Sequence, residues 1–250
     1  MSVEVLVTVA DGVMELRLSR PERKNALSLA MYDTLSDALR RAASEDDVRA
    51  VVFSSEGDVF CAGNDLASFL DGSAFAEPSP VLGFLRTLAA NTKPLVAAVQ
   101  GAAVGIGTTL LLHCDYVLVG PAAALRMPFA QLGVVPEAGS SLLLPALVGH
   151  PRAFAWLVLG EWIKAEEAVA AGLANRIVDH DGLHAAAMTV ARQIAALSPG
   201  AVQASRALLR KQLEPLLLPV IEAEAAAFKE RLAAPDTIAA ITAATSGRRR

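Results

Sequence analysis

The first half of the chain alternates short apolar segments with amphipathic ones, and this alternation constrains the fold more than any other feature. Two apolar segments, Val3–Val9 and Val13–Leu18, flank Asp11-Gly12, a pair that is typical of a tight hairpin turn. Further strands are expected at Ala50–Ser54, Leu95–Val99 and Tyr116–Val119, with helices at Ser28–Ala43 (capped by Ser28), Leu82–Ala90 and Ile106–His113. Because strands joined through a crossover helix pair in parallel, we expect an α/β fold whose sheet is covered by helices.

The second half of the chain is mostly helical. Helices are expected at Ser140–Val148, Arg152–Leu159, Ala165–Ala171, Leu183–Leu197, Pro199–Leu213 and Pro219–Ala233, and one short strand at Asn175–Val178. A length of 250 residues suits one layered domain, or one such domain with a small helical appendage. We therefore expect a core over residues 1–195 that carries the functional site, and a helical segment over residues 196–250.

Charge and cysteine content argue against several classes of protein. The formal net charge is −4, so no basic surface is available to neutralise phosphates, and we expect no nucleic-acid partner. The two cysteines, Cys61 and Cys114, are too few for a disulfide framework and have no partners spaced for zinc. We expect reduced thiols and a cytoplasmic protein.

One uncharged segment, the 18 residues Leu95–Leu112, approaches the length of a membrane span. It also contains Gln100, Gly101, Gly105 and Gly107, which make it a poor lipid-facing helix. We expect a buried strand, loop and helix there, and no membrane partner.

Two glycine-bearing loops follow apolar strands, at Phe60-Cys61-Ala62-Gly63-Asn64-Asp65-Leu66 and at Gly101-Ala102-Ala103-Val104-Gly105-Ile106-Gly107-Thr108-Thr109. Backbone amides at the start of a helix have no intrahelical partner, and small residues let a ligand approach them. Two such loops side by side could direct two amides at one oxygen, which is the geometry of an oxyanion hole. The alternative is that these glycines only make tight turns. The third glycine of a dinucleotide-binding loop is missing, as is the Gly-Lys-Ser/Thr of a P-loop.

Glu137 is the acid most suited to chemistry in this sequence. It lies in the apolar stretch Leu132-Gly133-Val134-Val135-Pro136-Glu137-Ala138-Gly139-Ser140, just before an expected helix. Low local polarity would raise the pKa of its carboxyl group, which suits a base that must also return a proton. An exposed acid in a turn, or in the first turn of the helix, is the alternative.

Other polar residues favour structural roles. His180 and His184 are four residues apart, but Asp181-Gly182 between them is expected to break the helix that would align them, and we expect no metal site. Glu161-Trp162 and Lys164–Glu167 are interpreted as the start of a helix and a solvated surface. A serine-hydrolase elbow, Gly-x-Ser-x-Gly, does not occur.

Several motifs in register resemble the crotonase superfamily, also called the enoyl-CoA hydratase/isomerase family. They are Arg20-Pro21-Glu22-Arg23-Lys24-Asn25-Ala26-Leu27-Ser28, the Phe60–Leu66 loop, Gly101–Gly107, Cys114-Asp115 and Gly133–Gly139. The resemblance covers about Val3 to Val178. It implies a crotonase-like spiral of ββα units with a C-terminal helical segment, in which residues 196–250 would form a homotrimer or a hexamer built as a dimer of trimers.

The resemblance also implies a site for an acyl-CoA thioester. The oxyanion amides would belong to Asn64 and Ile106, with Lys24 near the CoA phosphates and Ala26 beside the pantetheine arm. Further residues expected to contact the substrate are Ala62, Gly63, Asp65, Leu66, Gly105, Pro128, Phe129 and Leu132. Coenzyme A is part of the substrate, and no separate cofactor is expected.

Two departures from the family pattern indicate the reaction. Hydratases of this family use two glutamates, and the matching positions here hold Thr109 and Phe129. Glu137 matches the single catalytic glutamate of the peroxisomal-type Δ3,Δ2-enoyl-CoA isomerases. The resemblance therefore implies an isomerase of fatty-acid β-oxidation that moves a double bond from C3 to C2. Atypical hydration, thioester hydrolysis, decarboxylation and non-catalytic acyl-CoA binding are the alternatives.

Overall fold

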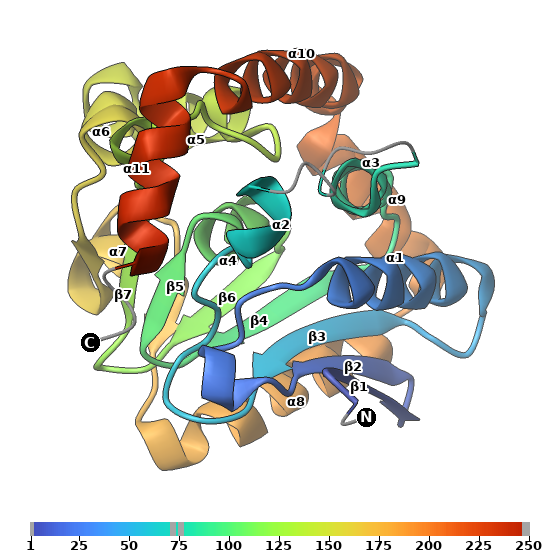
Figure 1. Cartoon of the computed structure of the whole chain (residues 1–250). Coiled ribbons are helices and arrows are strands. Elements are labelled where there is room, and N and C mark those ends of the chain that lie inside the picture. The colour runs from blue at the N-terminus through green and yellow to red at the C-terminus, as the bar shows by residue number, and fades with distance from the viewer. Residues whose placement is uncertain (1–2, 71–73, 75–77, 247–250) are drawn as a thin grey trace.

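The computed structural model describes residues 3–70, 74 and 78–246, which form a mixed α/β architecture around a six-stranded sheet (Figure 1). The strand order is β1-β2-β3-β4-β6-β9, and every pair except the β1–β2 hairpin is parallel. These strands are β1 (Val5–Ala10), β2 (Val13–Leu18), β3 (Ala50–Ser55), β4 (Leu95–Val99), β6 (Tyr116–Val119) and β9 (Arg176–Ile177). The parallel sheet expected from the alternation of strands and helices is confirmed.

The hairpin turns at the expected pair. Asp11 and Gly12 both have left-handed backbone, with φ of 53° and 77°, and Ala10 pairs with Val13 across the turn. Two consecutive positive φ values are what a tight two-residue hairpin turn requires. Strand β1 begins two residues later than expected, at Val5.

A second, three-stranded sheet consists of β5 (Ala102–Val104), β7 (Ala124–Arg126) and β8 (Ile163–Lys164). It was not expected, because strands of two or three residues are too short to show an alternating pattern. The chain turns from β4 into β5 at Gly101, where φ is 56° and a Cβ would lie 1.9 Å from the carbonyl oxygen of Asp58. Only glycine fits there.

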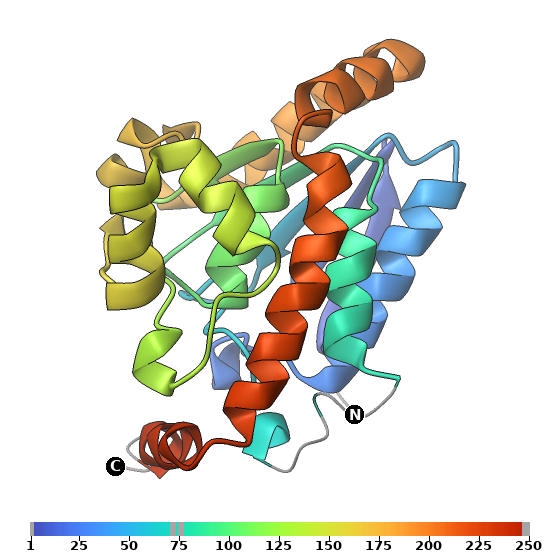
Figure 2. The same cartoon turned by 90° about the horizontal axis from the view of Figure 1, so that it is seen from above.

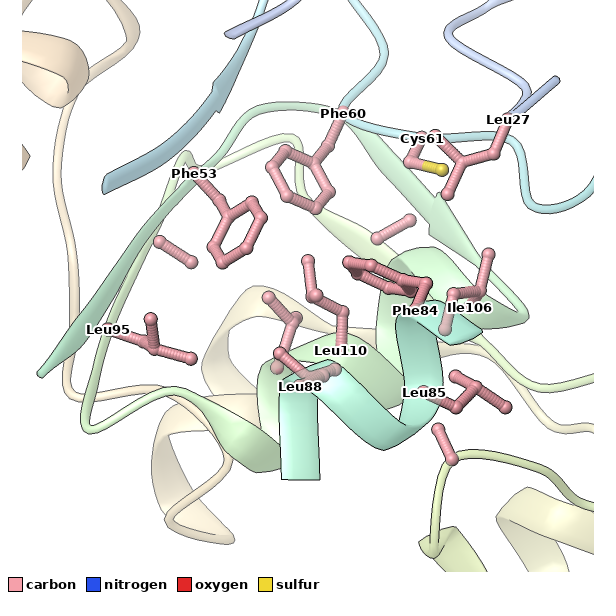
Figure 3. Packing of buried hydrophobic residues seen from close by; sticks show 14 of the residues in the cluster. Leu27, Phe53, Phe60, Cys61, Phe84, Leu85, Leu88, Leu95, Ile106 and Leu110 are labelled. Atoms are coloured by element: carbon pink, nitrogen blue, oxygen red, sulfur yellow. The ribbon is translucent and has the colours of Figure 1, made fainter. Parts of the chain in front are cut away.

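Helices α1 (Leu29–Ser44) and α3 (Pro80–Ala89) pack against one face of the sheet, with the rings of Tyr32 and Phe84 5.4 Å apart. The Ser28 hydroxyl accepts a hydrogen bond from the Met31 amide at 3.2 Å, so the expected cap of α1 is confirmed. The short helices α2 (Ala67–Leu70) and α4 (Ile106–Thr109) follow the glycine loops, and a 3-10 turn at Leu110–His113 continues α4. Figure 3 shows Phe53, Phe60 and Phe84 converging in the core between these elements.

Helix α8 (His180–Ala195) covers the opposite face of the sheet, where Leu183, Ala187 and Ala191 are buried against β3 and β4. The expectation that Asp181-Gly182 would break this helix is wrong. An acid in the first helical turn favours the helix start, and a glycine there costs less than in the interior. His184 Nε2 lies 2.8 Å from Glu15 Oε1, so this histidine contacts β2.

The remaining helices form the second half of the chain: α5 (Ser140–Val148), α6 (His150–Phe154), α7 (Ala165–Ala170), α9 (Pro199–Arg210), α10 (Glu214–Leu232) and α11 (Pro235–Ser246). A π-helical turn at Ala155–Leu159 continues α6. Helix α10 begins five residues earlier than expected and contains Pro219, which costs one hydrogen bond near the helix start. Helix α11 was not expected at all.

Figure 2 shows α10 running beside α3, which in turn lies beside α1. Helix α11 crosses the 3-10 turn Ala130–Leu132 and reaches α2. The C-terminal segment thus covers the edge where both glycine loops end. Its role in trimer formation, and the boundary at residue 195, stay predictions.

Within residues 3–70, 74 and 78–246, no helix is both long enough and apolar enough to cross a bilayer. The uncharged segment Leu95–Leu112 divides into β4, β5, α4 and a 3-10 turn, in agreement with a buried strand, loop and helix.

Candidate active site

The two glycine loops run side by side in parallel. Cys61 and Ala103 form a parallel bridge, with the Val104 amide donating to the Cys61 carbonyl oxygen at 2.9 Å. Counting three residues forward from each member of the bridge leads to Asn64 and Ile106. The pairing therefore brings the two expected oxyanion residues to neighbouring ends of the loops.

Glycines keep these loop ends open. Gly63 and Gly105 have positive φ values of 92° and 56°, and a Cβ on Gly105 would lie 3.9 Å from the Cα of Gly63. A Cβ on Gly63 would meet the Val104 carbonyl oxygen at 3.0 Å. The backbones of the two loops thus approach each other without intervening side chains.

Neither expected oxyanion amide donates to a backbone carbonyl among the described residues. Ile106 is the first residue of α4, so its N–H has no partner within the helix. In the described part of the chain, no backbone carbonyl accepts a hydrogen bond from the Asn64 N–H. The Asn64 side chain is held separately, because the buried Tyr32 hydroxyl donates to Asn64 Oδ1.

The Arg20–Ser28 segment anchors the first loop. The Ala62 amide donates to the Lys24 carbonyl oxygen at 3.0 Å, and the Arg20 guanidinium bonds both the Ala26 carbonyl oxygen and Asp65 Oδ2 at 3.0 Å. The Asp65 carboxylate is therefore paired with Arg20. Three residues expected to contact substrate, Lys24, Ala26 and Asp65, lie along this anchor and not in the lining of the large cavity.

A cavity of about 360 Å³ lies beside the loop ends. Expected substrate residues that line it are Ala62, Gly63, Asn64, Leu66, Gly105, Pro128, Phe129 and Leu132. Residues that sequence reasoning did not predict there are Val104, Arg126, Gln131, Val134, Trp162, Phe228, Leu232, Ile241 and Ala244. The cavity thus combines both glycine loops with α10 and α11.

Trp162 is partly solvated, as expected, but it also has a role that the sequence did not indicate. Its ring lines the large cavity, and the Arg126 guanidinium lies 5.0 Å from the ring centroid, a favourable cation–π contact. Half of the side chain is exposed, which is why its position next to charged residues suggested a surface role. The expected helix start is present, since α7 begins at Ala165 with two acids in its first turn.

Glu137 is buried, with 7% of its surface exposed, so the alternative of an exposed turn acid is wrong. Burial raises the pKa of its carboxyl group from 4.5 to about 8; a hydrogen bond from Thr109 lowers it, and the nearby Glu224 raises it further. The Thr109 hydroxyl donates to Glu137 Oε1 at 2.5 Å. The residue that replaces the first hydratase glutamate therefore contacts the remaining acid.

Glu137 lines a small cavity of about 20 Å³ that shares Asn64 and Phe228 with the large one. The acid, the Asn64 loop and the large cavity are therefore immediate neighbours. Phe129, which replaces the second hydratase glutamate, lines the large cavity and is buried. The small cavity thus holds two acids, Glu137 and Glu224, beside Asn64 and apolar walls, whereas Ile106 is buried and lines neither cavity.

Sequence reasoning missed Glu224 on α10. This buried carboxylate accepts hydrogen bonds from the Gly139 amide at 2.6 Å and the Ser141 amide at 2.9 Å. A signal was available, because Glu224 interrupts the otherwise apolar buried stripe Leu217, Ile221 and Phe228.

Metal ligands are not gathered near this site. Across the described residues, no three His, Cys, Asp or Glu side chains lie close enough to hold a metal ion.

A family model described as enoyl-CoA hydratase/isomerase matches residues 8–243 of the chain. The chain belongs to the enoyl-CoA hydratase/isomerase family. It is 33% identical to peroxisomal enoyl-CoA delta isomerase 3 of Mus musculus over 237 residues, which is 92% of the chain and 74% of the relative. It is 36% identical to a probable enoyl-CoA hydratase of Mycobacterium leprae over 208 residues, or 81% of each chain.

Solved structures show the same fold. An enoyl-CoA hydratase/isomerase from Pseudoalteromonas atlantica T6c superimposes with a TM-score of 0.93 at 37% identity, covering 98% of both chains. The crotonase fold expected from the sequence is confirmed. Relatives named isomerase and relatives named hydratase match the chain at similar sequence identity. The comparisons therefore show the family but not which of the two reactions the chain catalyses.

Proposed function

We propose that this protein is an enoyl-CoA isomerase that moves a double bond from C3 to C2 of an enoyl-CoA. The observation that carries this proposal is Glu137, a buried acid with a raised pKa beside the Asn64 loop. A group whose pKa lies near neutrality can both accept and return a proton. One carboxyl group is enough for an allylic shift, because the proton removed from one carbon is delivered to another.

In this mechanism, the thioester oxygen accepts hydrogen bonds from the amides of Asn64 and Ile106. Ionised Glu137 removes a proton from C2 of the 3-enoyl-CoA, and the electron pair moves onto the thioester oxygen to form an enolate. Glu137 then returns the proton to C4, so the double bond ends between C2 and C3. Atoms and charge balance without any other reactant.

Oxyanion donors and a positioned acid or base each contribute substantially to the rate of such a reaction. Losing one oxyanion donor typically costs ~3–4 kcal/mol of barrier, and one positioned acid or base contributes roughly 10²–10⁴-fold in rate. Apolar walls strengthen the electrostatic interactions by excluding water. Phe129 supplies such a wall where a hydratase would have its second acid.

Hydration by the same site is the second candidate, because a relative at 36% identity is named a probable hydratase. Adding water across a double bond requires one group to activate water and another to supply or hold a proton. Thr109 and Phe129 cannot ionise to do this. The second acid of the small cavity, Glu224, is bound to the Gly139 and Ser141 amides, so the residues present favour isomerisation.

The decisive experiment replaces the acid, as Glu137→Gln, and follows 3-hexenoyl-CoA. We expect isomerisation to fall by at least ~10²-fold while acyl-CoA affinity changes little, because the amide keeps the shape but not the basicity. Activity equal to that of the wild type would remove Glu137 from the mechanism.

Two further assays separate the alternatives. Crotonyl-CoA hydration by the wild type should be very slow, and brisk turnover would favour a hydratase. In heavy water, a saturated acyl-CoA should gain deuterium at C2 with the wild type and not with Glu137→Gln. A non-catalytic binder would show no exchange in either protein.

A further inference from the structure

Glu224 is an acid in an apolar setting. It lies on the face of α10 that buries Leu217, Ile221 and Phe228, and only 8% of its surface is exposed. A carboxylate in such a place costs stability unless its oxygens are hydrogen-bonded. The hydrogen bonds that the Glu224 carboxylate accepts therefore indicate its role.

Those bonds all go to the beginning of α5. Glu224 Oε2 accepts from the Gly139 amide at 2.6 Å, and Oε1 accepts from both the amide and the hydroxyl of Ser141. The local cap residue of α5 is Gly139, which has no side chain to offer. Glu224 thus supplies the cap from a helix far along the chain, where a negative charge also suits the helix dipole.

The capped turn is the one that carries Glu137. Ala138 and Gly139 directly follow it, with left-handed φ values of 59° and 70°. An alanine with positive φ is strained and persists only where its surroundings hold it. A Cβ on Gly139 would lie 2.3 Å from Leu217 Cδ1, so this turn fits tightly against α10. His113 Nε2 lies 2.7 Å from the Ala138 carbonyl oxygen on the other side.

We propose that Glu224 is the positioning residue of the catalytic acid: by tying the Ala138–Gly139 turn to α10, it directs Glu137 at the substrate. The two carboxyl groups line the same small cavity, so Glu224 also acts on Glu137 through its charge. This inference rests on the proposed function of Glu137.

The charge effect is specific to Glu224. In the described part of the chain, the titratable groups that interact with Glu137 are Tyr32, Cys61 and Glu224. Burial raises the pKa of Tyr32 well above its ordinary value and that of Cys61 to about 12, so both are neutral at pH 7. Burial raises the pKa of Glu224 as well, and in its ionised form Glu224 raises the pKa of Glu137, so we expect removal of this carboxylate to lower the Glu137 pKa.

The test is Glu224→Gln, with Glu230→Gln as the control because Glu230 is an exposed acid on the same helix. We expect kcat for 3-hexenoyl-CoA to fall roughly 10- to 100-fold, as a small misplacement of a reacting group does, with KM changed less than ~2-fold. The acid limb of the kcat–pH profile should also move to lower pH. The control should match the wild type in all three quantities. A purely structural role would lower kcat without moving the profile.

A second variant and a second readout keep the proposal testable. Ser141→Ala removes one donor to Glu224 but keeps the charge, so kcat should fall less and the acid limb should stay in place. The Glu137 carboxyl can also be titrated directly by carbon-13 NMR, its signal identified by loss in Glu137→Gln. A Glu137 pKa that is equal in the wild type and Glu224→Gln, or an unchanged kcat in a folded variant, would overturn the proposal.

This titration needs no turnover. An inactive wild type would refute the proposed isomerase function, whereas the carbon-13 measurement would still decide whether Glu224 acts on Glu137.

Discussion

At the scale of single residues, Glu137 shows how a buried acid trades stability for reactivity. The same desolvation that brings its pKa to about 8 disfavours the ionised form that the proposed reaction needs. The folded chain binds a proton at this group more tightly than the unfolded chain, for which the ordinary value is 4.5.

This difference predicts a pH-dependent gain in stability for Glu137→Gln. Between about pH 4.5 and 8 the folded state holds more protons than the unfolded state, so wild-type stability from this group falls as the pH rises. The glutamine side chain of the variant does not ionise, so its stability does not fall with pH in this way. At pH 9 we expect the variant to exceed the wild type by on the order of 5 kcal/mol, with little difference at pH 4. Urea unfolding at both pH values tests this; a gap that is equal at both would contradict it.

Thr109 predicts a shift in the opposite direction to that of Glu224. Its hydroxyl donates to Glu137 Oε1 and so lowers the pKa of that carboxyl. Thr109→Val keeps the shape and removes the donor, so the acid limb of the kcat/KM profile, near pH 8 in the wild type, should move to higher pH. Thr34→Val, on the exposed face of α1, serves as the control. A limb that stays in place would show that the hydrogen bond does not form in the working enzyme.

Residues differ in how far the sequence reveals them. Glu137 could be found because it is a lone acid in an apolar, glycine-punctuated stretch. Glu224 could not be assigned a role, because its partners Gly139 and Ser141 lie 85 and 83 residues away. The exposure of Trp162 was predicted, but its place in the cavity lining was not, because its charged sequence neighbours indicate only a surface position.

At the scale of elements, the glycine loops set the site geometry through close packing. Gly107 in α4 sits against the first loop, and a Cβ there would lie 2.7 Å from the Cys61 carbonyl oxygen. Gly83 in α3 has nothing within 4 Å of the same position. Both are helical glycines, so they form a matched pair.

We expect opposite outcomes for the two alanine variants. Gly107→Ala should destabilise the protein by roughly 1–3 kcal/mol through overpacking and reduce isomerisation by displacing the Ile106 amide. Gly83→Ala should stabilise it by about 0.5–1 kcal/mol with activity unchanged, because alanine favours the helix. Urea midpoints and kcat give the comparison; two variants of equal stability would refute the packing argument.

Long elements were predictable and short ones were not. The hairpin, α1 with its Ser28 cap and the parallel strands follow from periodicity and turn residues. Strands β5, β7 and β8 have two or three residues each and depend on pairing with distant segments. The helix was expected to begin at Pro219, yet α10 begins at Glu214, because the packing of Leu217 and Ile221 outweighs the single hydrogen bond that a proline removes.

At the scale of the whole molecule, exposed leucines predict self-association. Leu208 and Leu209 on α9 are 70% and 87% exposed, and Leu216 and Leu218 on α10 are 52% and 46% exposed. Leucines so exposed on two adjacent helices are unfavourable in water. We therefore propose that a second copy of the chain covers them, in line with the trimer or hexamer that the family resemblance implies.

Sedimentation velocity at micromolar concentration tests this. The wild type should sediment as an oligomer, and Leu208→Glu combined with Leu209→Glu should shift it to smaller species. Val9→Glu on the edge strand β1 should not, although Val9 is also exposed. A wild type that sediments as a monomer would contradict the proposal.

The large cavity is walled on one side by loops from the first half of the chain and on the other by Phe228, Leu232, Ile241 and Ala244. During ribosomal synthesis, the loops are made long before α10 and α11. While a nascent chain still lacks α10 and α11, its glycine loops lack the helices that line the cavity, and Glu137 lacks its contact with Glu224. The proposed activity would then depend on the docking of α10 and α11, and removal of these two helices would abolish turnover without unfolding the sheet.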